Sequence, residues 1–205
     1  MFFCFEKQKA YLTTTTKMKR IAVFASGSGT NAENLINYFR QNDGADVSLV
    51  LTDNPRARVL ERAAKYSVPT VVFSREELRE GKVLDKLVKN KIDFIVLAGF
   101  LSLVPRGITE HYQGRIVNIH PALLPAYGGK GMYGMKVHQA VIDAGEEESG
   151  ITIHYVNENY DDGDIVFQAR TEVFGDDTPE DLAERVHALE YKYYPQVVDD
   201  LVSAL

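Results

Sequence analysis

Apolar and polar positions along the chain follow two alternating rhythms. Short runs rich in β-branched and aromatic residues, such as RIAVFAS at 20–26, are typical of strands. Between them, apolar residues recur every three to four positions, as Leu35, Ile36 and Phe39 do within 30–42, which is typical of helices. The predicted strands are 20–26, 47–53, 69–74, 93–100 and 115–120, and the predicted helices are 30–42, 56–66, a charged stretch that ends near 90, and about 136–144.

Repeated strand–helix units of this kind predict a parallel sheet with helices on both faces. The run DFIVLAGF at 93–100 is the most continuously apolar, so we expect it to form a central strand that is covered on both sides. The rhythm then changes, because ITIHYV at 151–156 and DIVFQARTEV at 164–173 are separated only by a short acidic turn. This spacing indicates an antiparallel pair at the edge of the sheet.

The final segment, 181–205, has Leu182, Val186 and Leu189 at helix spacing and is predicted to be a helix. The fold class is therefore predicted as α/β: a doubly wound, mostly parallel sheet with an antiparallel C-terminal edge, in a single domain. We expect residues 18–205 to form this domain and residues 1–17 to be an N-terminal extension.

Composition narrows the class of partner. The chain has 205 residues and a formal net charge of −6, which argues against a nucleic-acid-binding surface because such surfaces are usually basic. No apolar run approaches the roughly 18 residues that a membrane helix needs. Cys4 is the single cysteine, which excludes an internal disulfide or a cysteine-rich zinc site and fits a reducing cytoplasm. We therefore expect small-molecule substrates, with no nucleic acid, membrane or metal, while the oligomeric state stays open.

The loop ASGSGTNAEN at 25–34 joins the first predicted strand to the first predicted helix. Its glycines permit a tight turn, and the start of a helix favours an anion; Thr30 and Glu33 also fit a capping box. The loop matches the dinucleotide fingerprint G-x-G-x-x-A as well, with Asp53 placed to bind a ribose at the end of the second strand. On this loop alone, a monophosphate and a nicotinamide cofactor are both acceptable ligands.

The segment NIHPALLPAYGG at 118–129 ends the fifth predicted strand. Asn118 and His120 project to the same face because alternate residues of a strand do so, and Pro121 blocks continuation of the ladder. Ligands of open α/β sheets bind beyond the carboxyl ends of the strands. An amide and an imidazole at that edge suit the polarisation of a carbonyl and the stabilisation of an oxyanion. We favour this interpretation over a polar strand end without a function.

The acidic segment YDDGDIV contains Asp161, Asp162 and Asp164. Its spacing does not fit a calcium loop and no histidine or cysteine flanks it, so a solvated hairpin turn is the ordinary explanation. One aspartate would be useful as a proton acceptor, because an amine that attacks a carbonyl must lose a proton. Among the remaining histidines, most are expected in packing or surface roles, and His138 and His154 are the candidates to line the cleft.

Five segments of the chain together resemble a known family. They are SGSGTN, LAGFLSLVP, NIHPALLPAYGGKGMYG, ITIHYVNENYDDGDIVFQ and LEYKYYP. Over about residues 18 to 200 the chain resembles the phosphoribosylglycinamide formyltransferase family, which is folate-dependent and acts in purine synthesis. The resemblance implies the formyltransferase fold and transfer of a formyl group from 10-formyltetrahydrofolate to the amine of 5′-phosphoribosylglycinamide.

The same resemblance implies roles for individual residues. Asn118 and His120 would stabilise the formyl oxyanion, with His120 as general acid, and Asp161 would assist proton movement and orient the imidazole. The ribonucleotide and its phosphate would be bound by Gly29, Thr30, Asn31 and Glu190. The folate would be bound by Leu101, Ser102, Leu103, Val104 and Asn118, together with the main chain around the acidic turn.

The sequence also departs from the family. The bacterial acidic turn reads D-G-G-P, whereas this chain has DDGD, and Asp161 keeps the catalytic place because it follows Tyr160. Ser102 stands where an arginine is usual, so a basic contact to the glutamate tail of the folate would come from Arg75 or Arg79. The segment GGKGMYGMKVH is longer than the shortest form in the family.

Two alternative enzymes stay open beside the transferase. One is a formyltetrahydrofolate hydrolase-like enzyme, although such hydrolases usually have an additional N-terminal domain. The other, more distant, is a nicotinamide-dependent oxidoreductase that would use Asp53. A non-catalytic nucleotide-binding module is a third class, for which Asn118 and His120 would be unnecessary.

Overall fold

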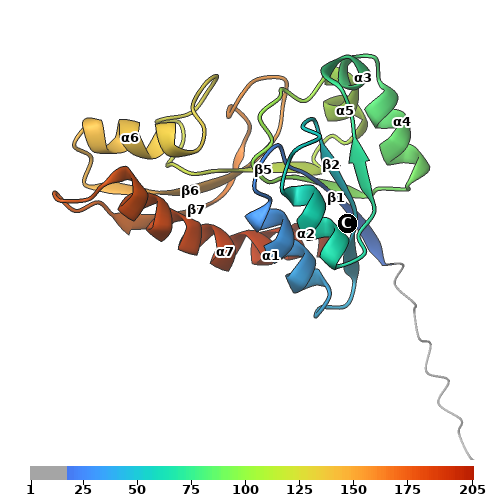
Figure 1. The fold of residues 1–205 in the computed structure, drawn as a ribbon, viewed down its shortest axis with the longest axis horizontal. Helices are drawn as coiled ribbons and strands as arrows, with labels where there is room; N and C mark the ends of the chain where they lie inside the picture. The colour runs from blue at the N-terminus through green and yellow to red at the C-terminus, as the bar shows by residue number, and fades with distance from the viewer. Residues whose placement is uncertain (1–17) are drawn as a thin grey trace, which may run out of the picture.

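A seven-stranded sheet runs through the molecule in the order β3-β2-β1-β4-β5-β6-β7, as seen in a computed structural model that describes residues 18–205 (Figure 1). The extension expected at 1–17 lies outside the described residues. The strands are β1 (Lys19–Phe24), β2 (Ala45–Thr52), β3 (Thr70–Val72), β4 (Phe94–Leu97), β5 (Ile116–His120), β6 (Glu148–Tyr155) and β7 (Ile165–Glu172). The helices are α1 (Thr30–Phe39), α2 (Val59–Lys65), α3 (Arg75–Arg79), α4 (Lys82–Lys89), α5 (Arg106–His111), α6 (Met135–Asp143) and α7 (Pro179–Ser203).

The direction of the strands confirms the predicted fold class. Strands β1 to β5 pair in parallel, whereas β6 pairs antiparallel with β5 and β7 antiparallel with β6. In Figure 1 the β6–β7 pair and α6 lie at one end of the molecule, and α3 and α4 lie at the other. Because β1 to β5 are parallel, their carboxyl ends lie along one edge of the sheet.

The helical segments differ from the sequence prediction in two places. The charged stretch that we expected as one helix is divided into α3 and α4 at Gly81, whose φ of 83° lies outside the helical region. The connection between β4 and β5 contains the short helix α5, which we had not predicted. Six residues span less than two helical turns, so α5 has too little periodicity to be recognised.

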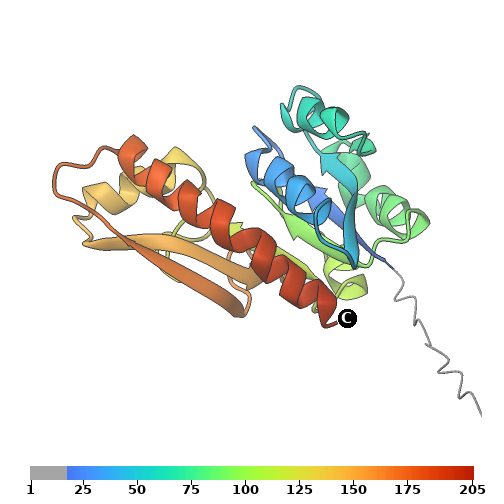
Figure 2. The ribbon, with the colours of Figure 1, turned by 90° about the horizontal axis from the view of Figure 1, so that it is seen from below.

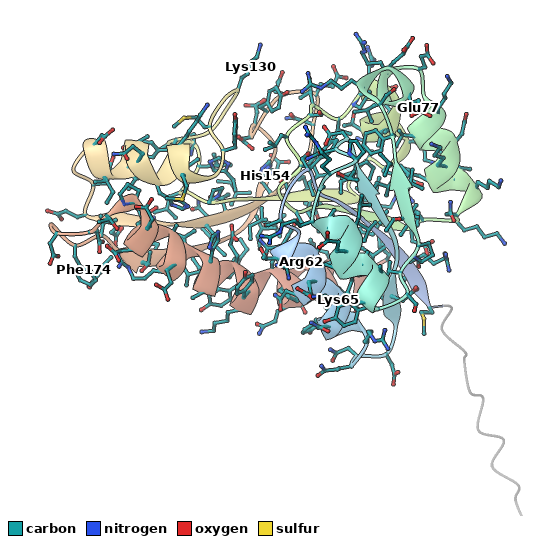
Figure 3. All side chains as sticks on the ribbon, viewed as in Figure 1. Arg62, Lys65, Glu77, Lys130, His154 and Phe174 are labelled. Carbon is teal, nitrogen blue, oxygen red and sulfur yellow. The ribbon has the colours of Figure 1, made fainter. Side chains whose placement is uncertain are left out.

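The capping box expected at Thr30 and Glu33 is wrong. Thr30 is the first residue of α1, the N-cap is Gly29 with a φ of 72°, and no side chain caps the helix. Glu33 forms a salt bridge with Arg62 and lies 3.6 Å from the Lys65 ammonium. Both basic residues are on α2 (Figure 3), so Glu33 connects two helices instead of closing one.

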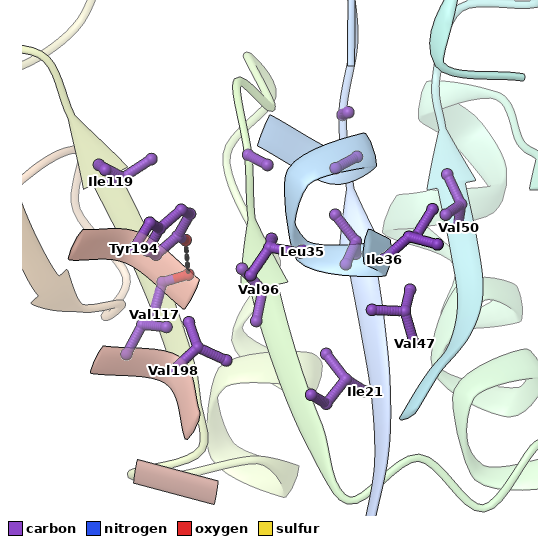
Figure 4. Packing of buried hydrophobic residues seen from close by; sticks show 14 of the residues in the cluster. Ile21, Leu35, Ile36, Val47, Val50, Val96, Val117, Ile119, Tyr194 and Val198 are labelled. Carbon is purple, nitrogen blue, oxygen red and sulfur yellow. Dashed lines mark hydrogen bonds between the residues drawn. The ribbon is translucent and has the colours of Figure 1, made fainter. Parts of the chain in front are cut away.

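The sheet separates two hydrophobic cores, which confirms that the central strand is covered on both faces. Phe94 and Val96 of β4 belong to the core that α1 and α7 cover (Figure 4), and Ile95 and Leu97 belong to the core on the opposite face. This alternation follows from the two-residue period of a strand.

Helix α7 brings several of its side chains to the carboxyl ends of the parallel strands. Figure 2 shows it running from the β6–β7 end of the molecule to a position beside α1. Its buried Tyr194 donates a hydrogen bond to the Leu97 carbonyl at 2.8 Å, at the carboxyl end of β4. The side chains one turn earlier on α7, including Glu190, are thereby held near the ends of the strands.

Candidate active site

A cavity of about 1030 Å³ lies beyond the carboxyl ends of β1, β4 and β5. The segments that follow these strands line it, and residues 129–134, α3 and α7 complete its walls. Its volume is at the upper end of the range of roughly 300–1,000 Å³ that is usual for one small molecule. It lies at the carboxyl ends of the strands, where ligands of open α/β sheets bind.

Asn118 and His120 both face this cavity from the end of β5, as their spacing predicted. Ile119, between them, packs in the core. His120 is 3% exposed, and its Nε2 donates to the Tyr127 carbonyl at 2.8 Å. The loop that follows Pro121 therefore holds the imidazole through its Nε2 atom, which leaves Nδ1 to contact a different group.

That second nitrogen is directed at Asp161, because the acidic turn folds back over β5. The Asp161 Oδ2 atom lies 3.5 Å from His120 Nδ1 and accepts a hydrogen bond from the Gly129 amide at 2.9 Å. The Oδ1 atom accepts from Asn118 Nδ2 at 3.3 Å. The Asp161 carboxylate thus contacts both Asn118 and His120, the two residues that their spacing on β5 had predicted to share a face.

The backbone of the turn shows how Asp161 reaches this position. Its φ is 53°, in the left-handed region that aspartate tolerates better than most residues. Two residues later, a Cβ at Gly163 would lie 1.8 Å from the Tyr155 carbonyl oxygen. Only glycine allows the turn to pass this close to the end of β6. The neighbouring Asp162 accepts bonds from Asn157 and Asn159, which is the ordinary role of a polar turn residue.

His154, which we expected as a candidate to line the cleft, is a fourth member of the cluster but is not among the residues that line the cavity. It lies opposite Asn118 in the β5–β6 register, inside the molecule (Figure 3). Its Nδ1 donates to the Tyr155 carbonyl at 2.8 Å, so its Nε2 accepts from Asn118 Nδ2 at 3.1 Å. The same Nε2 is 3.6 Å from Asp161 Oδ1. Antiparallel pairing of β6 with β5 creates this contact, and strand spacing alone does not reveal it.

Burial and charge set the protonation of the cluster. Burial lowers the pKa of His120, and the charge of Asp161 and the bond to Tyr127 offset this only in part. For Asp161, burial by itself would raise the pKa, but the His154 side chain, the charge of His120 and the Gly129 amide together lower it. In neutral solution the resting pair is therefore a carboxylate beside a neutral imidazole.

The glycine loop forms the other end of the cavity. A Cβ at Gly29 would lie 2.5 Å from the Val59 side chain, so this turn requires glycine. Asn31 donates to the buried Glu190 carboxylate at 2.8 Å, and Gly29, Thr30, Asn31 and Glu190 all line the cavity. Burial raises the pKa of Glu190, although the Asn31 bond and His187 act in the opposite direction.

Residues 101–103, which follow β4, form the cavity wall between the cluster around His120 and the glycine loop. Leu101 and Leu103 are 49% and 41% exposed, which leaves apolar surface at the cavity that Ser102 also lines. Val104 is buried in the second core and does not line the cavity, so the structure brings three of these four predicted residues to it. Arg75 and Arg79 line the cavity from α3, where they are exposed.

Two further histidines lie at the cavity. His138 on α6 is 2% exposed, and its Nδ1 atom has no hydrogen-bond partner among the described residues. Its ring centre is 6.4 Å from that of His187 on α7. Their contact depends on how α6 packs against α7, so it has no signal in the sequence.

Within 18–205, no cluster of three or more histidine, cysteine, aspartate or glutamate side chains is arranged to hold a metal ion. None of the helices in this range is long and apolar enough to cross a membrane.

The chain matches known proteins over almost its whole length. A family model described as formyl transferase matches residues 19–198. The phosphoribosylglycinamide formyltransferase of Bacillus subtilis is 36% identical, over 90% of this chain and 95% of that protein. The chloroplastic enzyme of the same name from Arabidopsis thaliana is 42% identical over 89% of this chain. The chain spans about two thirds (65%) of the length of the plant relatives that it matches.

Solved structures give the same result. The crystal structure of phosphoribosylglycinamide formyltransferase from Bacillus halodurans has a TM-score of 0.82 and 39% identity, over 90% of this chain and 96% of that one. The enzyme of the same name from Anaplasma phagocytophilum has a TM-score of 0.83 and 34% identity, over 91% and 88% of the two chains.

Proposed function

The chain belongs to the formyl transferase family, and from this premise we propose that it transfers the formyl group of 10-formyltetrahydrofolate to the amine of 5′-phosphoribosylglycinamide. The observation that carries the proposal is the Asp161 carboxylate, which lies within 3.5 Å of both Asn118 and His120. Formyl transfer to an amine needs an oxyanion donor and a proton acceptor at one point, and this cluster supplies both. The relatives named above act in the same reaction class, and none of them favours the hydrolase or the oxidoreductase.

The two ends of the cavity suit the two substrates. The Gly29–Asn31 turn offers backbone amides at the start of α1 for the phosphate of the ribonucleotide. Glu190, held by Asn31, is placed to accept hydrogen bonds from the same substrate. The exposed Leu101 and Leu103 offer apolar contacts for the folate ring system.

Asn118 would donate a hydrogen bond to the oxyanion as it forms, and His120 would become a second donor once it has accepted the proton of the amine. The Asn118 bond to Asp161 is the longer of its two, at 3.3 Å against 3.1 Å to His154, so that amide hydrogen is the one available to the formyl oxygen. Both donors belong to one rigid strand end, so little reorganisation is needed when charge develops on the oxygen.

The proton would pass through His120. The attacking amine becomes cationic, and the neutral imidazole, whose pKa is lowered by burial, accepts its proton. Asp161 stabilises the imidazolium that forms. His120 then returns the proton to the N10 nitrogen of the folate as the tetrahedral intermediate collapses, so the proton moves from the amine to the leaving group without net change in the protein.

One assay separates the candidate functions. The protein is mixed with glycinamide ribonucleotide and a 10-formyl folate analogue, and the deformylated folate is followed by absorbance. Product that requires both substrates supports the transferase. Product without the ribonucleotide would indicate a hydrolase, and no product in any mixture would overturn the proposal. A cytoplasmic location stays a prediction, and the plant relatives are named chloroplastic.

A further inference from the structure

Asp53 is held by two serine side chains at the edge of the proposed site. It follows the end of β2 and does not line the cavity. Its Oδ1 accepts from Ser26 Oγ at 2.7 Å, and its Oδ2 accepts from Ser102 Oγ at 2.7 Å. These distances are typical of strong hydrogen bonds to a charged oxygen. Both carboxylate oxygens are therefore engaged by protein hydroxyls, and Asp53 lies outside the cavity lining, so its placement does not favour the role of a ribose-binding acid.

Ser26 extends these bonds to the main chain. Its Oγ accepts from the Leu101 amide at 3.1 Å, and its own amide donates to the Gly99 carbonyl at 3.0 Å. We call Ser26, Asp53 and Ser102 the Asp53 network. Within residues 18–205, the segment 101–104 makes no hydrogen bond to the rest of the protein other than those to this network.

The network joins the two halves of the cavity. Ser26 directly precedes the 27–31 loop, which is the proposed phosphate site, and Ser102 lies within 101–104, the proposed folate wall. The wall is irregular and carries exposed leucine side chains, so its backbone has no strand or helix to hold it. Asp53 accepts one hydroxyl from each side, Ser26 beside the phosphate loop and Ser102 in the folate wall. Its carboxylate can therefore set the distance between these two parts of the cavity.

We propose that Asp53 is a positioning residue that fixes segment 101–104 against the end of β1 and thereby sets the folate wall relative to the phosphate loop; this inference rests on the proposed function. Ser102 acts through the same carboxylate. Its hydroxyl serves the geometry of the wall through Asp53.

The test compares Asp53→Ala, Ser102→Ala and the double variant. We expect Asp53→Ala to raise the KM for the folate about tenfold, because it removes two hydrogen bonds to a charged group. Ser102→Ala should raise it by a smaller factor. In the double variant the Ser102 change should add almost nothing, because the partner of that hydroxyl is already absent.

Two further variants separate positioning from general stability. Asp53→Asn keeps one acceptor oxygen and the shape of the side chain, so it should restore much of the folate KM. Asp46→Ala removes a similar bond, from Ser48 Oγ at 2.6 Å, near the opposite end of β2 and away from the cavity. It should leave both KM values unchanged. A folded Asp53→Ala protein with the wild-type folate KM would overturn the inference.

A second measurement does not depend on activity. Amide hydrogen exchange at 101–104 should become at least about tenfold faster in Asp53→Ala, with little change in Asp46→Ala. Faster exchange in a protein whose wild type shows no formyl transfer would leave the Asp53 network standing and reject the proposed function. Unchanged exchange in an active enzyme would reject the network and keep the function.

Discussion

The Oδ2 atom of Asp161 lies 3.5 Å from Nδ1 of His120, although His120 ends β5 and Asp161 lies in the connection between β6 and β7. The contact is possible because β6 pairs antiparallel with β5 and the following turn returns over the end of β5. The proposed proton transfer through His120 and the pKa of its imidazole depend on this distance.

Asn118→Ala and His120→Ala should each lower kcat by about 100- to 1000-fold, because Asn118 is the proposed donor to the formyl oxyanion and His120 the proposed carrier of the amine proton. Steady-state formyl transfer, with circular dichroism to verify folding, measures the effect. His111→Ala, on the exposed side of α5, is the matched control and should retain wild-type kcat. Near-normal transfer by a folded His120→Ala protein would refute the proposed roles.

Asp161→Asn should lower the pKa of His120 further. Burial already lowers this pKa, and the Asp161 charge is one of two effects that oppose the lowering. Removing the charge weakens the protonated imidazole, so the His120 titration midpoint moves to lower pH. NMR titration of the histidine ring protons measures the midpoint, with His120→Asn as the assignment control. An equal or higher midpoint would show that the two side chains do not interact.

The same pKa sets the acidic side of the activity profile. If neutral His120 accepts the amine proton, kcat falls as the pH drops through the lowered pKa of His120. Because burial lowers that pKa below its ordinary value, the half-maximal point on the acidic side of a kcat–pH profile should lie below about pH 6.5, and a half-maximal point above this pH would contradict the prediction.

His138 should make the folded protein less stable in mild acid. Burial, with smaller contributions from His187 and His120, lowers its pKa from 6.5 to about 4. Below about pH 6.5 the unfolded chain binds a proton that the folded chain does not bind until about pH 4, so the free energy of unfolding falls as the pH drops. Between about pH 7.5 and about pH 5 this residue accounts for roughly 2 kcal/mol of the loss. Urea unfolding should show a smaller pH dependence in His138→Gln, and an equal dependence would be the contrary result.

Gly29→Ala should weaken both the fold and the binding of the ribonucleotide. An alanine there adopts a φ of 72° and places its Cβ 2.5 Å from the Val59 side chain. The left-handed conformation alone costs about 1–2 kcal/mol. We expect at least this loss in unfolding free energy and a higher KM for the ribonucleotide. The control is Gly107→Ala, where a Cβ meets nothing within 4 Å, and equal behaviour of the two variants would contradict the prediction.

Tyr194→Phe should destabilise the protein by about 1–2 kcal/mol, because it removes a buried hydrogen bond to the Leu97 carbonyl. Tyr112 is equally buried, but its hydroxyl makes no hydrogen bond to other described residues. Tyr112→Phe should therefore change the unfolding free energy by less than about 0.5 kcal/mol. Chemical denaturation of both variants gives the comparison, and equal losses would mean that the hydroxyl bond to β4 is not the cause.

Local patterns determined much of this protein. The two-residue period of strands predicted that Asn118 and His120 face one side, and the alternation of apolar runs with helical segments predicted the parallel sheet and its antiparallel edge. The glycines after β1 marked the turn at the cavity, because their freedom at positive φ is a property of the residue itself. Such features depend on neighbours in the chain, so they can be predicted from the sequence.

The tertiary structure decided which distant groups meet. Asp161 with His154, Glu190 with Asn31, and Asp53 with Ser26 and Ser102 come together only once strand order and helix packing are set. The lowered pKa of His138 likewise arises from burial between α6 and α7, and no neighbour in sequence causes it. These contacts join segments far apart along the chain, and the sequence of either segment alone does not specify its partner.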